Sequence, residues 1–203
     1  ESGFAEALSD TGVTGICGSG IIEVVAEMYL AGVVSTDGVV DGALAGQTSR
    51  IKKDGRTWSY VLHEAHHPEA SDVVITQTDV RQIQLAKAAL YAGIKLLMDE
   101  MGVATVDRIR LAGAFGSHIS VSHAMVLGLI PDCDLEQVTS AGNAAGAGAR
   151  MALLDRNARL EIADTIAKAE RIETALADDF QAHFVGAMGL PHQSDAFPNL
   201  FSS

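Results

Sequence analysis

Three clusters of glycine have a composition and spacing that allow a protein backbone to approach a ligand closely. They are Gly15-Ile-Cys-Gly-Ser-Gly20, Gly113-Ala-Phe-Gly-Ser117 and Gly142-Asn-Ala-Ala-Gly-Ala-Gly-Ala149. Glycine has no Cβ, so a flat or anionic ligand can lie against the main chain where glycine stands. None of the clusters matches Gly-x-Gly-x-x-Gly or the lysine-containing phosphate loop. Each cluster alone therefore leaves ligand binding and simple packing both open.

The first cluster leads directly into an apolar pattern of helical period, Ile21–Leu30. The N-terminus of a helix offers unpaired N–H groups and a positive dipole end to an anion. Gly18 and Gly20 would let the anion approach, and Ser19 would add a hydroxyl donor. Cys17 lies in the same turn, and we interpret it as a small buried apolar residue rather than a reactive thiol.

Other residues with chemical potential carry weaker signals. His63, His66 and His67 lie among carboxylates, but Pro68 and the preceding strand pattern do not suit a helix that presents ligands. We therefore predict solvated loop histidines and no metal site. Asp132 and Asp134 around Cys133 are predicted to be a solvated loop. No Ser/His/Asp arrangement can be assigned, so no catalytic residue is predicted.

The elements that position these clusters alternate between strand and helix. A helix is expected to end at Gly32, and Asp54-Gly55 predicts a hairpin turn. The alternation after residue 72 predicts an α/β domain with parallel pairing. The helix after residue 78 has an apolar face at Ile83, Ala86, Leu90, Ile94, Leu97 and Met101, which we expect to face the core. Its expected cap is Thr78 or Asp79, and its expected end is Gly102. The predicted elements are strands at Arg50–Lys53, Thr57–His63, Asp72–Ile75, Asp107–Ala112 and Gln137–Ser140, and helices at His123–Leu129, Gly142–Leu154 and Ala158–Ala177, with a last short helix around Phe180–Met188.

Composition excludes several classes of function. Of 203 residues, 48% are hydrophobic and 20% charged, which is enough for a buried core. The net charge of −12 argues against sequence-independent binding to nucleic acid or to an anionic membrane. No apolar run is long enough to span a bilayer. Two cysteines are too few for a disulfide framework, so a reducing cytoplasm is predicted. The chain begins at Glu1 without a methionine or a secretory segment, and we interpret it as part of a longer protein.

Taken in order, four stretches resemble one protein family. Gly15–Glu23, Gln77–Lys87, Leu111–Ser117 and Gly142–Ala149 are similar to the C-terminal region of the reductive activators of corrinoid proteins. These activators are ATPases of the ASKHA superfamily, which also holds acetate and sugar kinases, heat-shock chaperones and actin. The resemblance covers roughly residues 12 to 192, and the combination of motifs is more specific than any one of them.

The resemblance implies a fold and a site. The fold would be α/β, an incomplete ribonuclease-H-like second lobe of an ASKHA ATPase. Residues 1–177 would form this lobe without its phosphate hairpin, and residues 178–203 would be an extension packed on it. The adenosine turn would comprise Gly113, Ala114, Phe115, Gly116 and Ser117, with Phe115 beside the adenine. Gly18, Ser19 and Gly20 would lie near the nucleotide, and Gly142, Asn143 and Gly146 would belong to the helix that connects the lobes.

The resemblance also implies cofactors and partners. The intact activator would use ATP or ADP with Mg²⁺, carry a 2Fe–2S cluster in an N-terminal domain, and reduce the cobalt(II) of a corrinoid protein to cobalt(I). This chain departs from the pattern, because two cysteines cannot hold that cluster and Asp54-Gly55-Arg56-Thr57 does not have the Asp-x-Gly-Thr spacing of the phosphate hairpins. It is therefore expected to be inactive alone. A homodimer is left open. The alternatives are a kinase lobe, an activator of 2-hydroxyacyl-CoA dehydratases, or a non-catalytic interaction domain.

Overall fold

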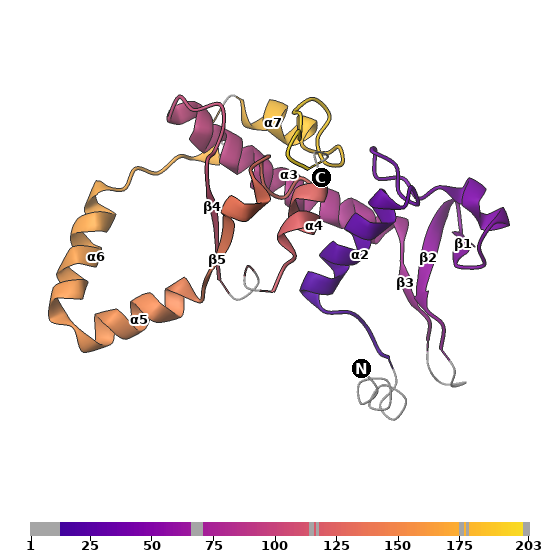
Figure 1. The fold of residues 1–203 in the computed structure, drawn as a ribbon, viewed down its shortest axis with the longest axis horizontal. Coiled ribbons are helices and arrows are strands. Elements are labelled where there is room, and N and C mark those ends of the chain that lie inside the picture. The colour runs from indigo at the N-terminus through magenta and orange to yellow at the C-terminus, as the bar shows by residue number, and fades with distance from the viewer. Residues whose placement is uncertain are drawn as a thin grey trace.

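The computed structural model describes residues 13–65, 71–113, 116, 118–174, 177 and 179–200 (Figure 1). Ala114, Phe115, Ser117, His66 and His67 lie outside the described residues. Helices and strands alternate along the chain, as expected for an α/β protein. The elements are α2 (Gly18–Leu30), the 3₁₀ helix η1 (Gly42–Gly46), β1 (Ile51–Asp54), β2 (Thr57–His63), β3 (Val73–Ile75), α3 (Gln77–Glu100), β4 (Ile109–Ala112), α4 (Val121–Val126), the 3₁₀ helix η3 (Leu135–Gln137), β5 (Val138–Gly142), α5 (Ala144–Leu154), α6 (Arg156–Lys168) and α7 (Phe180–Gly186).

The described strands form two separate sheets. β1, β2 and β3 are antiparallel in that order, and Gly55, with φ of +58°, makes the tight turn between β1 and β2. β4 and β5 are parallel, with Ile109 opposite Val138 and Leu111 opposite Ser140. The predicted hairpin is confirmed. The parallel pairing predicted for the strands after residue 72 is confirmed for β4 and β5 but was wrong for β3, which pairs antiparallel with β2. In a parallel pair both carboxyl ends lie at the same edge, so the turns that follow β4 and β5 are neighbours.

Two interlocking groups of side chains form the core. One is centred on α2, whose Ile22 and Val25 pack with Val126 and Leu127 at the end of α4. The other joins α3 and α4 to the C-terminal segment, with Tyr91, Met125 and Phe197 among its members. α2 ends at Gly32, with φ of +71°, as the sequence predicts. α7 confirms the predicted last short helix, and it packs along α3.

The N-cap of α3 lies two residues before Thr78 and three before Asp79, the two predicted caps. Thr76 is the N-cap, and its hydroxyl accepts a hydrogen bond from the Asp79 N–H while the Asp79 carboxylate accepts from the Thr76 N–H. This reciprocal arrangement is a capping box, and it satisfies N–H groups that the helix leaves unpaired. The prediction of Thr78 or Asp79 as the cap was wrong, because Asp79 is the third residue of the helix. Gly102, with φ of +65°, ends the helix as predicted.

The predicted core face of α3 is wrong. Leu90, Leu97 and Met101 are 49%, 54% and 74% exposed. The buried side of the helix instead combines two polar residues with apolar ones: Val80, Gln84, Lys87, Ala88, Tyr91, Ala92, Leu96 and Met98. The physical reason is that this side receives the C-terminal segment, whose backbone carbonyls need hydrogen-bond donors. Gln84 donates to the Met188 carbonyl, and Lys87 to that of Pro191.

α5 and α6 extend away from the rest of the molecule (Figure 1). Neither helix contains a buried residue. α6 ends at Lys168, nine residues before the predicted end at Ala177. Its apolar side chains remain exposed, so the amphipathic pattern does not correspond to packing within this chain. None of the described helices has the length and apolar content needed to cross a bilayer.

Candidate functional site

The carboxyl ends of β4 and β5 bring two of the three glycine clusters together. The Gly113 N–H donates to the Gly142 carbonyl at 2.8 Å. Both glycines have positive φ, +105° at Gly113 and +64° at Gly142, a region that other residues rarely adopt. A Cβ placed on either residue would meet no atom within 4 Å among the described residues, its own chain neighbours aside. The two turns therefore present adjoining backbone with open space above it, at the edge where α/β proteins bind ligands.

Gly116 has a different reason to be glycine. A Cβ there would lie 3.1 Å from the Leu111 Cβ and 3.2 Å from the Leu111 carbonyl carbon. The turn thus folds back onto the end of β4, and this close approach accounts for Gly116 without a ligand. The proposed adenosine-binding roles of Ala114, Phe115 and Ser117 lie outside the described residues and stay predictions.

The start of α5 is shaped by its cap. Asn143 is the N-cap, and its Oδ1 accepts a hydrogen bond from the Gly146 N–H at 2.9 Å. A Cβ on Gly146 would lie 2.7 Å from the Asn143 Nδ2, so a side chain at residue 146 would displace the cap. Gly148, one turn on, has no neighbour within 4 Å of such a Cβ. At Gly148, therefore, no described element packs closely enough against α5 to require glycine.

The third cluster forms the N-terminus of α2. Cys17 is the N-cap, with its Sγ 3.4 Å from the Gly20 N–H and 3.3 Å from the Ser19 Oγ. The prediction of a buried Cys17 was wrong, because the thiol is exposed. The Ser19 hydrogen bond, and then that of Gly20, lowers the pKa of Cys17. This end of α2 and the carboxyl ends of β4 and β5 all point toward the lower edge of the view in Figure 1.

Among the described residues, no set of side chains fits an iron–sulfur cluster or a metal ion held by protein ligands alone. Within the described ranges, no group of three or more His, Cys, Asp or Glu side chains is placed to hold a metal. Cys133 is buried, and its burial raises the pKa of the thiol, whereas Cys17 lies exposed at the start of α2. A 2Fe–2S cluster needs four ligands, and this chain has two cysteines.

The acidic residues around Cys133 have structural partners. Asp132 accepts two hydrogen bonds from Asn199, at 3.0 and 2.6 Å. Asp134 caps η3 by accepting from the Glu136 N–H. The predicted solvated loop is thus a tether for the C-terminal segment, and the signal for it was the Asx-type capping chemistry of aspartate.

Comparison with known proteins identifies the family. Residues 4–201 match the family described as the C-terminal domain of RACo, the ASKHA domain. The chain belongs to this family. It is 34% identical over 157 residues to the corrinoid activation enzyme RamQ of Eubacterium limosum, a match that covers 73% of this chain and 26% of RamQ. It also resembles the solved structure of a reductive activator for corrinoid, iron–sulfur protein, with a TM-score of 0.79, 31% identity, and coverage of 92% of this chain and 29% of that one.

These findings confirm the expected α/β class and the ASKHA assignment. They also mean that the chain spans between a quarter and a third of the length of the relatives it matches. The mixed architecture and the parallel β4–β5 pair are therefore features of an ASKHA domain. The activity of a whole activator is not a property that this domain carries by family membership alone.

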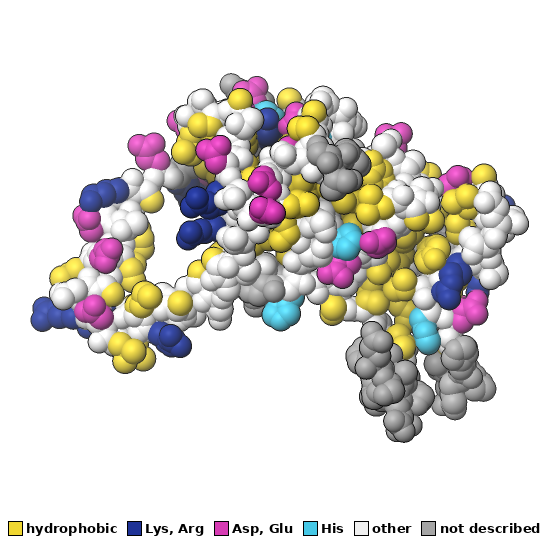
Figure 2. All heavy atoms as spheres, viewed as in Figure 1, with side chains coloured by type: hydrophobic (Ala, Val, Ile, Leu, Met, Phe, Trp, Pro, Cys, Tyr) yellow, Lys and Arg dark blue, Asp and Glu magenta, His cyan; other side chains and the backbone are white. Residues whose placement is uncertain are grey.

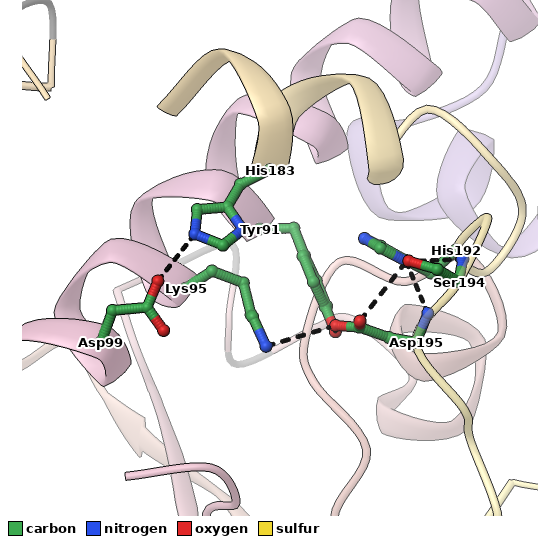
Figure 3. A network of polar contacts seen from close by, with 7 residues as sticks. All are labelled: Tyr91, Lys95, Asp99, His183, His192, Ser194 and Asp195. Carbon is green, nitrogen blue, oxygen red and sulfur yellow. Dashed lines mark hydrogen bonds and ion pairs between the residues drawn. The ribbon is translucent and has the colours of Figure 1, made fainter. Parts of the chain in front are cut away.

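Sequence reasoning missed a polar network in this ASKHA domain (Figure 3). The Tyr91 hydroxyl donates to Asp195 at 2.7 Å, and Lys95 forms an ion pair with the same carboxylate at 3.4 Å. The Nδ1 of His192 accepts hydrogen bonds from the N–H groups of Ser194 and Asp195. Burial lowers the pKa of His192 and raises that of Tyr91. A neutral imidazole suits this geometry, because Nδ1 must keep its lone pair to accept.

The same face of α3 continues to a second tether. Asp99, two turns beyond Tyr91, lies 2.7 Å from the Nε2 of His183 in α7 (Figure 3). The spacing of four between residues 87, 91, 95 and 99 places these polar side chains on one side of the helix. The sequence shows this spacing of four, but the neighbouring apolar positions led to the wrong prediction of the buried face. These contacts hold the C-terminal segment on α3, since Tyr91 and Lys95 both contact Asp195, and Asp99 contacts His183.

Proposed function

We propose that this chain is the nucleotide-binding C-terminal part of an ATP-dependent reductive activator of corrinoid proteins. Its family supports the proposal, as do two relatives whose names state activation of corrinoid proteins. The family match favours this function over a dehydratase activator, a kinase lobe or a pure interaction domain. We further propose that residues 1–177 are the lobe and 178–203 its extension, and that the protein works in the cytoplasm.

The adjoining turns at Gly113 and Gly142 are the observation that carries the proposal. Adenosine would lie against this edge, because backbone without side chains leaves room for a flat base and a ribose. Ala114, Phe115, Gly116 and Ser117 complete the proposed turn, with Phe115 beside the adenine. Gly18, Ser19 and Gly20 would supply N–H and hydroxyl donors to the phosphates, and Mg²⁺ would accompany them.

The proposed role of the nucleotide is energetic. Transfer of one electron from an iron–sulfur donor reduces cobalt(II) to cobalt(I), and the step is uphill for a ferredoxin-type donor. ATP that binds one conformation better than another shifts the equilibrium by its difference in affinity. This chain's residues would bind the nucleotide and set the position of α5, which begins at Ala144, just after Gly142. The iron–sulfur cluster would belong to another part of the activator.

The test is titration calorimetry with ATP and ADP on alanine variants of glycines with positive φ, +64° at Gly142, +58° and +65° at the two control positions, and +105° at Gly113. Gly113→Ala and Gly142→Ala place a methyl group in the open space of the proposed site. Gly55→Ala and Gly102→Ala are matched controls, because both residues also have positive φ and no atom within 4 Å of a Cβ. We expect at least a tenfold loss of affinity in the first pair and less than a twofold change in the second. Equal affinities in all four variants would overturn the assignment.

A further inference from the structure

A groove of about 480 Å³ lies between α2, α4 and β2, away from the glycine turns of the proposed nucleotide site. Its floor is apolar, formed by Val24 and Met28 of α2, by Val33, and by Tyr60 and Leu62 of β2. Figure 2 shows hydrophobic side chains gathered over this part of the molecule, next to acidic and histidine side chains. The groove is therefore a concave surface on which apolar side chains border charged ones.

The α2 and α4 side of the groove is acidic. Glu23 and Glu27 line it one turn apart, and His123 lines it from α4. The Nε2 of His123 lies 2.7 Å from the Glu27 Oε1, so this pair joins the two helices. The other ring nitrogen, Nδ1, is buried and has no hydrogen-bond partner among the described residues. Glu23 forms no ion pair within the described part of the chain, so its carboxylate is available to an incoming cation.

One helix of the groove begins at a glycine cluster of the proposed nucleotide site, and the other begins a few residues after a second cluster. α2 starts at Gly18, and α4 starts at Val121, shortly after the turn at residues 113–117. A ligand at Gly18–Gly20 would therefore lie at the N-terminus of α2, one of the two helices whose side chains line the groove. The Glu27–His123 contact links the two helices at the groove.

We propose that this groove docks a segment of the corrinoid protein that presents apolar side chains flanked by lysine or arginine. The proposal rests on the proposed function, which supplies the corrinoid protein as partner. The chemistry follows from complementarity. The apolar side chains favour burial of apolar area, and Glu23, whose carboxylate has no ion pair among the described residues, attracts cations and repels acidic segments. The net charge of −12 strengthens the preference for a basic partner surface.

The test measures binding of a purified corrinoid iron–sulfur protein to the immobilised complete chain by biolayer interferometry. Glu23→Lys reverses the charge of one wall, and Val24→Arg places a cation in the floor. Glu100→Lys is the control, because it makes the same charge change at an exposed residue at the end of α3. We expect each groove variant to raise Kd at least tenfold and the control to change it less than twofold. Higher salt should weaken binding to the native chain and narrow this difference.

ATP titrations of the same variants separate the two proposals. Groove variants that bind ATP normally but lose the corrinoid protein support the docking site, and normal ATP binding also shows that they are folded. If the corrinoid protein does not bind the native chain, or binds the native and groove-variant chains equally, the docking proposal is wrong whatever ATP does. If ATP fails to bind the native chain, the proposed nucleotide site is wrong, and the interferometry still decides the groove.

Discussion

Lys87 is a fully buried cation on the inner side of α3. Its Nζ donates to the carbonyl oxygens of Gly189 and Pro191 in the C-terminal segment. Burial lowers the pKa of Lys87 from its ordinary value of 10.5 to about 7. Between those two values the unfolded chain holds one more proton than the folded chain, so the free energy of unfolding rises with pH.

The first prediction concerns this pH dependence. From pH 7 to 8.5, Lys87 should contribute up to about 1.4 kcal/mol per pH unit to the rise in unfolding free energy. Lys87→Met removes the titrating group, and it also leaves two carbonyls without a donor, so it should flatten the slope and lower the stability. Urea denaturation of both proteins at several pH values measures the difference. Parallel slopes would show that Lys87 keeps its ordinary pKa.

Gly128 and Gly32 form a matched pair for a second prediction. Both have positive φ, +70° and +71°, so alanine at either residue should cost about 1–2 kcal/mol of backbone strain. A Cβ on Gly128 would lie 2.1 Å from the Pro191 carbonyl oxygen, whereas one on Gly32 would meet nothing within 4 Å. Gly128→Ala should therefore be less stable than Gly32→Ala by a further amount of about 1–3 kcal/mol. Thermal unfolding of both variants tests this, and equal losses would mean that the C-terminal segment is not held against Gly128.

At the scale of elements, α3 shows where sequence reasoning succeeds and where it fails. The length, the glycine stop and the existence of the helix follow from local chemistry that the sequence displays. The choice of its buried face does not, because the face is decided by what packs there. The C-terminal segment brings backbone carbonyls, which favour Gln84 and Lys87 as neighbours over the apolar residues of the other face.

Neighbouring leucines of α3 provide the third prediction. Leu96 is 9% exposed and Leu97 is 54% exposed, although the sequence pattern predicts Leu97 in the core. Leu96→Ala should cost about 2–5 kcal/mol, as expected for a large-to-small core substitution. Leu97→Ala should change stability by no more than about 0.5 kcal/mol. Chemical denaturation of the two variants measures both losses of stability. A larger loss for Leu97→Ala than for Leu96→Ala would show that the face predicted from the sequence is the buried one.

The candidate site was also only partly predictable, because it depends on contacts between residues that are distant in the sequence. The glycines at residues 113 and 142 were identified from composition, and parallel pairing of β4 and β5 explains why they meet. The space above them, however, depends on long-range register that a single sequence does not specify. The docking groove was not predicted, since it combines α2, β2 and α4 from distant parts of the chain.

Across the whole molecule, the C-terminal segment joins parts that are distant in sequence. The Leu190 N–H donates to the Thr36 carbonyl, Asn199 donates to Asp132, and Asp195 accepts from Tyr91. These bonds connect the loop after α2, the loop after α4 and the middle of α3. The stability of the body therefore depends on its last residues, whereas α5 and α6 have no comparable attachment.

The fourth prediction follows from this contrast. α5 contains two glycines, each of which costs about 1 kcal/mol of helix stability relative to alanine, and neither α5 nor α6 buries a residue. Their amides should exchange with deuterium about 100-fold faster than those of the buried side of α3, because local opening exposes little apolar surface. If ATP binds at Gly113 and Gly142, saturating ATP should slow exchange in the first turn of α5, and Gly142→Ala should abolish that slowing. Mass spectrometry of exchanged peptides measures both effects, and exchange in α5 as slow as in α3 would mean that another surface covers the helix in solution.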